Sequence, residues 1–178
     1  MKRVVVVAIF FACGSRPKPP SVDVRAEVEQ AEQAEKARRH DLAKIHFERA
    51  VAGAKDPTSI AFARREYAET LITWGEYPAA IQHLEIALGA RGEDPVAWRY
   101  LGFLKHNRGD SPGAILAFEK SRDLSPKDFV IRRDLAVLRW KTGDRAGAAE
   151  EYRRMLDLEL PARLREKVEW ALRELAKP

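Results

Sequence analysis

The chain has 178 residues, of which 33% are charged and 46% hydrophobic, and this composition excludes wholesale disorder and a collagen-like fibre. Its single cysteine excludes an internal disulfide and every zinc or iron–sulfur site that needs several cysteines. The net charge of +5 does not indicate a nucleic-acid partner, because residues 1–20 carry four bases and no acid, which leaves 28 bases against 27 acids in the rest.

The segment 1–13 predicts a signal that directs the chain to a membrane. Lys2 and Arg3 precede an unbroken apolar run from Val4 to Ala12, and this order is typical of a secretory signal. The run is too short to span a bilayer, because a spanning helix needs about 20 apolar residues. The alternative is a hydrophobic N-terminal strand with a buried Cys13, but the prolines that follow could not continue a sheet.

Around Cys13 the sequence reads FACGS, which resembles the lipobox of bacterial lipoproteins, although Phe10 stands where that family usually has leucine. The resemblance implies that Cys13 is acylated and becomes the mature N-terminus, in the outer membrane and facing the periplasm. An upstream start or an uncleaved anchor would account for the departures from the pattern. Residues 14–23 are expected to be a linker, since the segment RPKPPS favours an extended spacer.

A repeat with a period of 34 organises the chain after residue 23. Gly75, Gly109 and Gly143 follow one another at this spacing. The same spacing relates two further sets, which are Ala80, Ala114 and Ala148, and the bulky Leu84, Phe118 and Tyr152. A period of this length indicates repeated units that bury their apolar faces against one another.

This pattern resembles the tetratricopeptide repeat (TPR), a pair of antiparallel helices. The best copy covers residues 95–128, where six residues stand at consensus positions of the family: Trp98, Leu101, Gly102, Ala114, Phe118 and Pro126. The resemblance implies an all-α fold, a TPR solenoid of antiparallel helix pairs that forms a right-handed superhelix with a C-terminal capping helix.

The TPR domain is expected over residues 24–162, in the repeats 24–57, 61–94, 95–128 and 129–162, with the capping helix over 163–178. The first repeat diverges, because Arg38 replaces the turn glycine. The segment 58–60 is expected to lengthen the helix that follows it. The glycines at the turns are expected to have positive φ, and Asp110 and Asp144 to begin the next helices. Gly102 is expected to let two helices approach closely, with Phe118 filling the space between them.

No arrangement of residues indicates catalysis. The four histidines, His40, His46, His83 and His106, share no metal-ligand spacing. The chain has neither a glycine-rich phosphate loop nor a nucleophile elbow, and Cys13 lies in the signal. The acid pair Glu150-Glu151 is interpreted as solvated surface charge. We therefore expect no enzyme, no cofactor, no metal and no small-molecule substrate.

The resemblance to TPR proteins implies a concave groove, lined by the first helix of each pair, that holds a partner. The residues at the family's groove positions are Arg65, Glu69, Arg99, Phe103, His106, Asn107, Arg133, Trp140 and Lys141. Three of them, Arg65, Arg99 and Arg133, recur at the repeat spacing and predict a ladder of guanidinium groups along one face. Such a ladder suits an extended peptide or a helix with acidic groups.

Two other roles for these arginines are open. Arginines often cover helix faces with their alkyl stems, or pair with neighbouring acids such as Glu66 and Asp134. The clamp of Lys and Asn that some TPR proteins use for carboxylates is not matched, because Asn107 is the only asparagine at these positions. Of the four tryptophans, Trp140 alone maps to the groove, and the others are interpreted as packing residues.

Together the resemblances imply a lipid-anchored scaffold of the bacterial envelope that holds or helps assemble another protein. Its layout is similar to that of small pilotins, which help outer-membrane secretins of type IV pili to assemble. Adaptors for peptidoglycan enzymes and for outer-membrane protein insertion share this layout. The alternatives are a dimeric enzyme accessory with a small ligand, and a cytoplasmic TPR regulator in which the segment 1–13 is not a signal.

Overall fold

The computed structural model describes residues 21–177, and within them the chain forms nine helices and no strand. The helices are α1 (Val24–Lys36), α2 (His40–Gly53), α3 (Pro57–Trp74), α4 (Tyr77–Ala90), α5 (Pro95–Asn107), α6 (Ser111–Leu124), α7 (Phe129–Lys141), α8 (Arg145–Leu156) and α9 (Ala162–Leu175). The all-α prediction is therefore confirmed.

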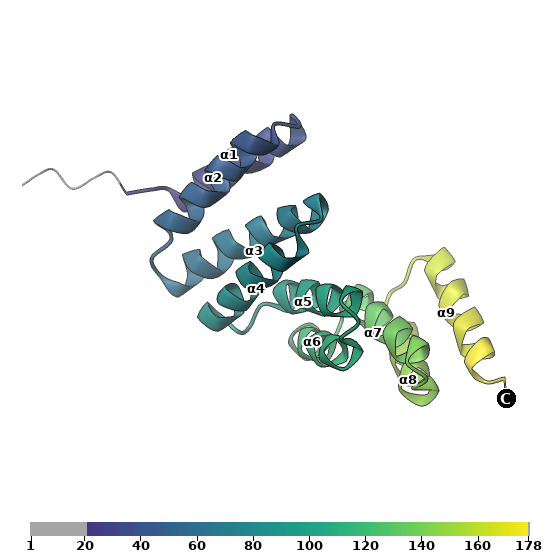
Figure 1. Cartoon of the computed structure of the whole chain (residues 1–178). Helices are drawn as coiled ribbons and strands as arrows, with labels where there is room; N and C mark the ends of the chain where they lie inside the picture. Colours follow the sequence, from purple (N-terminus) through teal and green to yellow (C-terminus); the bar gives the residue numbers. More distant parts are fainter. Residues whose placement is uncertain (1–20, 178) are drawn as a thin grey trace, which may run out of the picture.

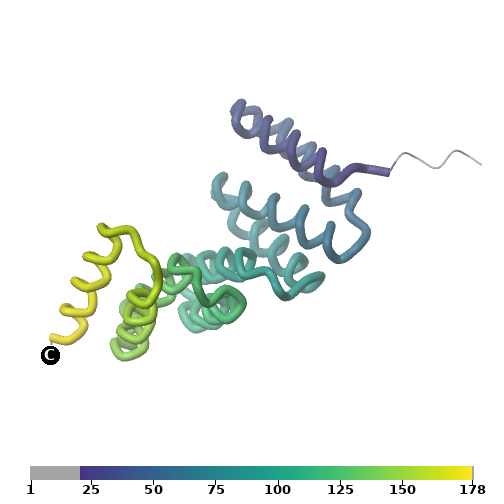
Figure 2. The backbone as a smooth tube through the Cα atoms, turned by 180° about the vertical axis from the view of Figure 1, so that it is seen from behind, coloured from purple at the N-terminus to yellow at the C-terminus, as the bar shows by residue number. Residues whose placement is uncertain are grey.

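The helices pack as consecutive pairs that form a solenoid. The pairs are α1 with α2, α3 with α4, α5 with α6, and α7 with α8; each pair contacts the next, and α9 packs on α8. The pairs follow one another along a curved path from α1 at one end to α9 at the other (Figures 1 and 2). Each pair has a neighbour on at least one side, so the apolar faces of the repeats are covered in sequence.

The turn between the two helices of each pair requires a left-handed residue. Gly75, Gly109 and Gly143 have φ of 79°, 82° and 90°, which confirms the prediction from their spacing. Arg38 occupies the same place in the first pair with a φ of 57°, and it is the one non-glycine residue with positive φ in the described part of the chain. The first repeat therefore keeps the turn of the others without the residue that adopts it most easily.

Close packing inside the pairs follows the predicted small residues. A Cβ atom at Gly102 would lie 3.0 Å from the Phe118 ring, so α5 and α6 approach closely at this point. Asp110 and Asp144 begin α6 and α8, where their carboxylates accept hydrogen bonds from the backbone N–H groups of Gly113 and Gly147 at 2.9 and 2.8 Å. These features confirm the predicted helix starts and the predicted close approach.

The α3 helix is the longest of the described helices, with 18 residues from Pro57 to Trp74. It begins at a capping box, in which the Asp56 carboxylate accepts from the N–H of Ser59 at 3.0 Å. Residues 58–60 lie inside it, so they lengthen this helix as expected. Pro57, placed at the end of the first repeat, is instead the first residue of α3.

The capping helix α9 does not continue the repeat register. In α7 the buried residues include Ile131 and Leu135, whose counterparts one repeat period later are Arg165 and Glu169. Because these two residues are charged, α9 is rotated about its own axis relative to a repeat helix, and it buries Val168, Ala171 and Leu175 instead. Its exposed side chains are mostly polar, with Trp170 as an exception, so α9 covers part of the apolar end of the solenoid.

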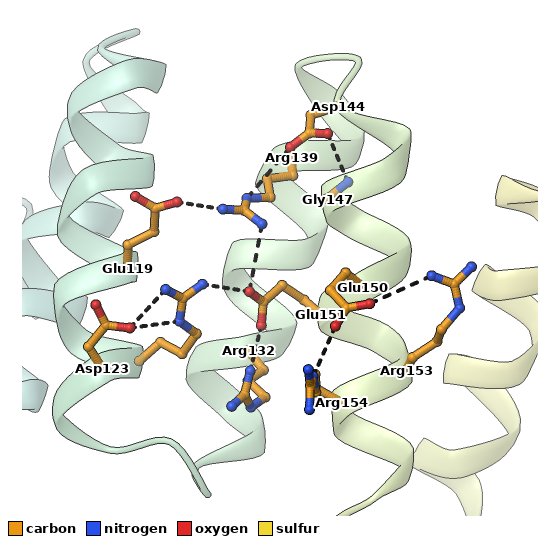
Figure 3. Close-up of polar contacts among 11 residues, drawn as sticks. Glu119, Asp123, Arg132, Arg139, Asp144, Gly147, Glu150, Glu151, Arg153 and Arg154 are labelled. Atoms are coloured by element: carbon orange, nitrogen blue, oxygen red, sulfur yellow. Dashed lines mark hydrogen bonds and ion pairs between the residues drawn. The ribbon is translucent and has the colours of Figure 1, made fainter.

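A buried carboxylate joins the last two repeats, and it corrects the interpretation of Glu150-Glu151 as surface charge. Glu151 of α8 is 3% exposed and accepts hydrogen bonds from Arg122 of α6 and Arg132 of α7, both at 2.7 Å (Figure 3). The guanidinium of Arg139 lies 3.7 Å away and also pairs with Glu119. Glu150, by contrast, is exposed and pairs with Arg154 on its own helix. Glu151 thus links α8 to arginines of α6 and α7.

Candidate functional site

Two adjoining cavities lie on the C-terminal half of the solenoid. The first, of about 450 Å³, lies between α5 and α7 and includes Arg99, Phe103 and His106. The second, of about 770 Å³, lies between α7 and α9. Both are lined by Arg133, Val137 and Lys141, so they adjoin along this stripe of α7, and we call the two together the C-terminal groove. The lining residues on α5 and α7 include the family's groove positions predicted from the sequence.

We call the part between α7 and α9 the cap pocket. Its lining consists of Arg133, Val137, Trp140, Lys141, Tyr152, Leu164, Lys167, Val168, Trp170 and Ala171. The Trp140 and Trp170 rings are tilted at 41° with centroids 6.2 Å apart, and Trp140 meets Tyr152 edge to face at 6.4 Å. Although it lines the pocket, Trp170 is 54% exposed. A large aromatic surface therefore remains open to a ligand.

Trp170 and Lys167 are functional candidates that the sequence analysis missed. Trp170 was interpreted as a packing residue, and its exposure in the cap pocket corrects that interpretation. The signal was its position outside the apolar stripe of the C-terminal helix. Lys167 follows Arg133 at the repeat spacing and would have been found by extending the arginine ladder into the capping helix.

Basic side chains surround the cap pocket. Arg133 is 45% exposed and pairs with the adjacent Asp134 at 2.8 Å. Within residues 21–177, the lysines that form ion pairs are Lys105 and Lys177. Lys141 and Lys167 therefore keep free ammonium groups at the rim, which gives this end of the groove a positive potential.

The predicted arginine ladder is largely engaged in ion pairs. Arg65 bonds to Glu66 and to Asp94, the latter at 3.1 Å, and its side chain is 22% exposed. Arg99 lies 3.7 Å from Asp134 and covers the ring of Tyr100, with its guanidinium carbon 5.2 Å from the ring centroid. The structure therefore contains the pairing with Glu66 and Asp134 that the sequence offered as the alternative. Arg133 is the member most accessible to a partner.

The N-terminal half of the molecule carries an acidic cavity of about 250 Å³ between α1 and α3. Its carboxylates are Glu32, Glu35, Glu66 and Glu69, and its one base is Lys36. Burial raises the pKa of Glu66, and the nearby carboxylates of Glu69 and Glu32 raise it further against the effect of Arg65. Arg65 and Glu69 lie in this half, separate from the C-terminal groove, and Asn107 lies at the exposed end of α5 without lining either cavity.

Two other tryptophans are packing residues, as predicted. The indole N–H of Trp74 donates to Glu35 at 3.0 Å, which ties α3 to α1. The indole N–H of Trp98 donates to the Gly92 carbonyl at 2.8 Å, which fixes the loop before α5. Both side chains are therefore committed to the fold.

Other kinds of site have no support in the described residues. Between residues 21 and 177, no three side chains of His, Cys, Asp or Glu gather closely enough to hold a metal ion. None of the helices described combines the length and the apolar character that crossing a membrane requires. The predicted signal and its Cys13 lie outside the described residues.

The chain is similar to known proteins in part of its sequence and in its fold. No protein-family model matches the chain. A stretch of 70 residues is 37% identical to a TPR repeat-containing protein of Pseudomonas aeruginosa, and the match covers 39% of this chain and 29% of that relative. The solved structure of Pseudomonas aeruginosa pilF has a TM-score of 0.70 at 20% identity, over 86% of this chain and 71% of that one. The chain therefore has the fold of tetratricopeptide-repeat proteins.

TPR proteins are generally scaffolds for protein–protein interaction and not enzymes. One with a similar fold is the first TPR of Spaghetti (RPAP3), solved with the HSP90 peptide SRMEEVD, with a TM-score of 0.58 and 17% identity over 66% of this chain and 94% of that one. At these identities the solved structures establish the fold alone. The partner of this TPR chain has to be inferred from its own surface.

Proposed function

We propose that this TPR protein is a membrane-anchored scaffold that holds another protein of the bacterial envelope in its C-terminal groove. The observation that carries the proposal is the groove itself, with two adjoining cavities, exposed aromatic side chains and free lysines. Open apolar depressions with a few polar groups are where proteins bind ligands, and the extended surfaces of solenoids serve the same purpose. The groove can therefore bury a segment of a partner.

The anchor belongs to the proposal and is supported by the sequence around Cys13. A single acyl chain binds membranes reversibly, whereas the two or three chains of a lipoprotein make the anchor effectively permanent. Residues 14–23 would then extend about 30 Å if they adopt a polyproline-like form. This reach would let the groove act on a partner beside the membrane.

Mass spectrometry of the mature protein tests the anchor. An N-terminal Cys13 with attached acyl chains is expected. An intact Met1 would instead favour the cytoplasmic regulator and would contradict the envelope location.

Capture of partners from solubilised envelope tests the groove. The full chain is compared with a double variant, Arg133→Glu with Lys141→Glu, because these residues line both cavities. The matched control is Arg49→Glu with Lys120→Glu, which makes the same charge change at exposed positions on α2 and α6. A protein held by the wild type and the control, and lost by the groove variant, is the expected result. Equal capture by all three proteins would contradict binding in the groove.

A narrower form of the proposal is a pilotin-type role, in which the partner is an outer-membrane secretin of a type IV pilus. The order of lipobox, proline-rich segment and small TPR domain in the sequence supports it. A strain without the chain should then lose its secretin multimers. Normal multimers in that strain would reject the narrower form and leave the general one standing.

A further inference from the structure

The cap pocket exists because α9 has no second helix. In the four repeats a second helix covers the first, but α9 ends the solenoid and buries only Val168, Ala171 and Leu175. The volume of about 770 Å³ that remains beside it is within the range of about 300–1,000 Å³ found for ligand pockets. Trp170 lines this pocket, and its side chain is half exposed. The pocket thus has unused apolar surface.

We propose that the cap pocket binds one or two large apolar side chains, aromatic ones above all, that lie within an acidic segment of the partner protein. This inference rests on the proposed function and specifies which residue types the bound segment of the partner contains. The Trp140 and Trp170 rings offer faces and edges to an aromatic anchor. Arg133, Lys141 and Lys167 stand around the same cavity, where carboxylates beside the anchor can pair with them.

Charge along the molecule fixes where an acidic segment can lie. The cavity between α1 and α3 presents four glutamates against one lysine, so it disfavours an acidic ligand. The rim of the cap pocket presents three bases. An acidic segment is therefore directed to the α7–α9 end, and any basic residues of the same ligand are directed toward α1 and α3.

Other occupants fit these charges less well. The apolar run at residues 4–12 of a second copy follows Lys2 and Arg3, and residues 1–20 contain no acid, so the basic rim would repel it. A nucleic acid would need a broad basic surface, and the chain after residue 20 has 28 bases against 27 acids. An anionic lipid shares the chemistry of an acidic apolar ligand and is tested below as a competitor.

Binding of a labelled synthetic peptide to the full chain tests the proposal. The probe is a glutamate-rich peptide of about 15 residues, long enough to form a helix, with two phenylalanines on one face. Two matched probes replace the phenylalanines by alanine or the glutamates by lysine. Fluorescence anisotropy should show binding of the first probe, weakening with added salt, and binding at least tenfold weaker for both matched probes.

Matched variants locate the site. Trp170→Ala and Lys167→Glu should each weaken the first probe at least tenfold. Leu116→Ala removes an apolar side chain that is 64% exposed on α6, and Lys120→Glu changes charge at an exposed position of the same helix, so both should leave binding unchanged. Because Trp170 is half exposed, its replacement should leave the helical circular dichroism spectrum intact.

Several results would overturn the proposal. They are equal binding to Trp170→Ala, no binding of the acidic aromatic peptide, or tighter binding of the lysine peptide. Vesicles of anionic phosphatidylglycerol that bind the pocket variants less well than the wild type, while the peptide does not bind, would assign the pocket to lipid. A partner still captured by Trp170→Ala and Lys167→Glu but lost by the double variant at Arg133 and Lys141 would reject the cap pocket and retain the proposed function.

Discussion

Four helix turns between residues 21 and 177 place a residue in the left-handed region, and in three of them that residue is glycine. Arg38, with φ of 57°, is the exception. A side chain in this conformation costs about 1–2 kcal/mol because its Cβ crowds the following carbonyl. Arg38→Gly should therefore raise the free energy of unfolding by about 0.5–1 kcal/mol, after the greater chain entropy of glycine is subtracted.

Urea denaturation measures this change. Arg49→Gly, in the middle of α2, is the contrasting variant and should lower stability by about 1 kcal/mol. If Arg38→Gly also destabilises the protein, the side chain of Arg38 contributes more than its conformation costs.

Glu151 shows how one buried charge can connect three helices. Glu151→Gln should lower the free energy of unfolding by about 3 kcal/mol, because Arg122 and Arg132 would keep their charges without a carboxylate between them. Glu150→Gln, next to it and exposed, should change stability by less than about 0.5 kcal/mol. Similar effects of the two substitutions in chemical denaturation would contradict the role given to the buried network.

His83 makes the stability of the fold depend on pH. Its ring packs 4.7 Å from Tyr67, and burial, together with the charge of Arg64, lowers its pKa from 6.5 to about 4. Between pH 4 and 6.5, His83 binds a proton more readily in the unfolded chain than in the folded one. Its contribution to the free energy of unfolding therefore falls as pH drops from 6.5 to 4, by about 1–2 kcal/mol after allowance for partial solvent contact. His83→Phe should flatten the pH profile of stability in that window. An unchanged profile would show that other groups control it.

At the scale of single helices, α9 departs most from what its sequence register implies. Val168 is buried, whereas the larger Trp170 is half exposed. Val168→Ala should therefore cost about 1–2 kcal/mol of stability, and Trp170→Ala less than about 1 kcal/mol. Thermal denaturation of the two variants measures this. The reverse order would mean that α9 keeps the orientation of a repeat helix.

The helices and turns were predictable because most of their determinants recur from repeat to repeat. Glycine at three of the turns, aspartate at several helix starts and the close pair Gly102 and Phe118 all depend on local geometry within a helix pair. The Glu151 network was not predictable, since it joins residues from three helices at separations of 19 and 29 positions. Trp170 escaped prediction because α9 has no counterpart to cover it.

The candidate site was predicted in part for a similar reason. Positions within the repeat register, such as Phe103, His106 and Trp140, lie in the C-terminal groove as the family pattern implies. The engagement of Arg65 and Arg99 depends on acids further along the chain, Asp94 at the start of α5 and Asp134 in α7. Only the packed structure shows which guanidinium groups are already paired.

At the scale of the whole molecule, the charges are unevenly distributed although their sum is small. Glutamates gather between α1 and α3, and free lysines with tryptophans gather between α7 and α9. This polarity means that a bound segment should have a preferred direction. For the proposed acidic segment, we therefore expect most of the binding free energy to come from contacts at the α7–α9 end of the solenoid.

Site-specific photo-crosslinking in cells tests most directly whether the C-terminal groove holds a protein. A photoreactive residue is placed at Val137, which lines both cavities, or at Leu116, which is exposed on α6 outside the groove. We expect a crosslinked protein adduct from position 137 and none from position 116. An adduct from position 116 alone would place the partner on another face and contradict the central claim.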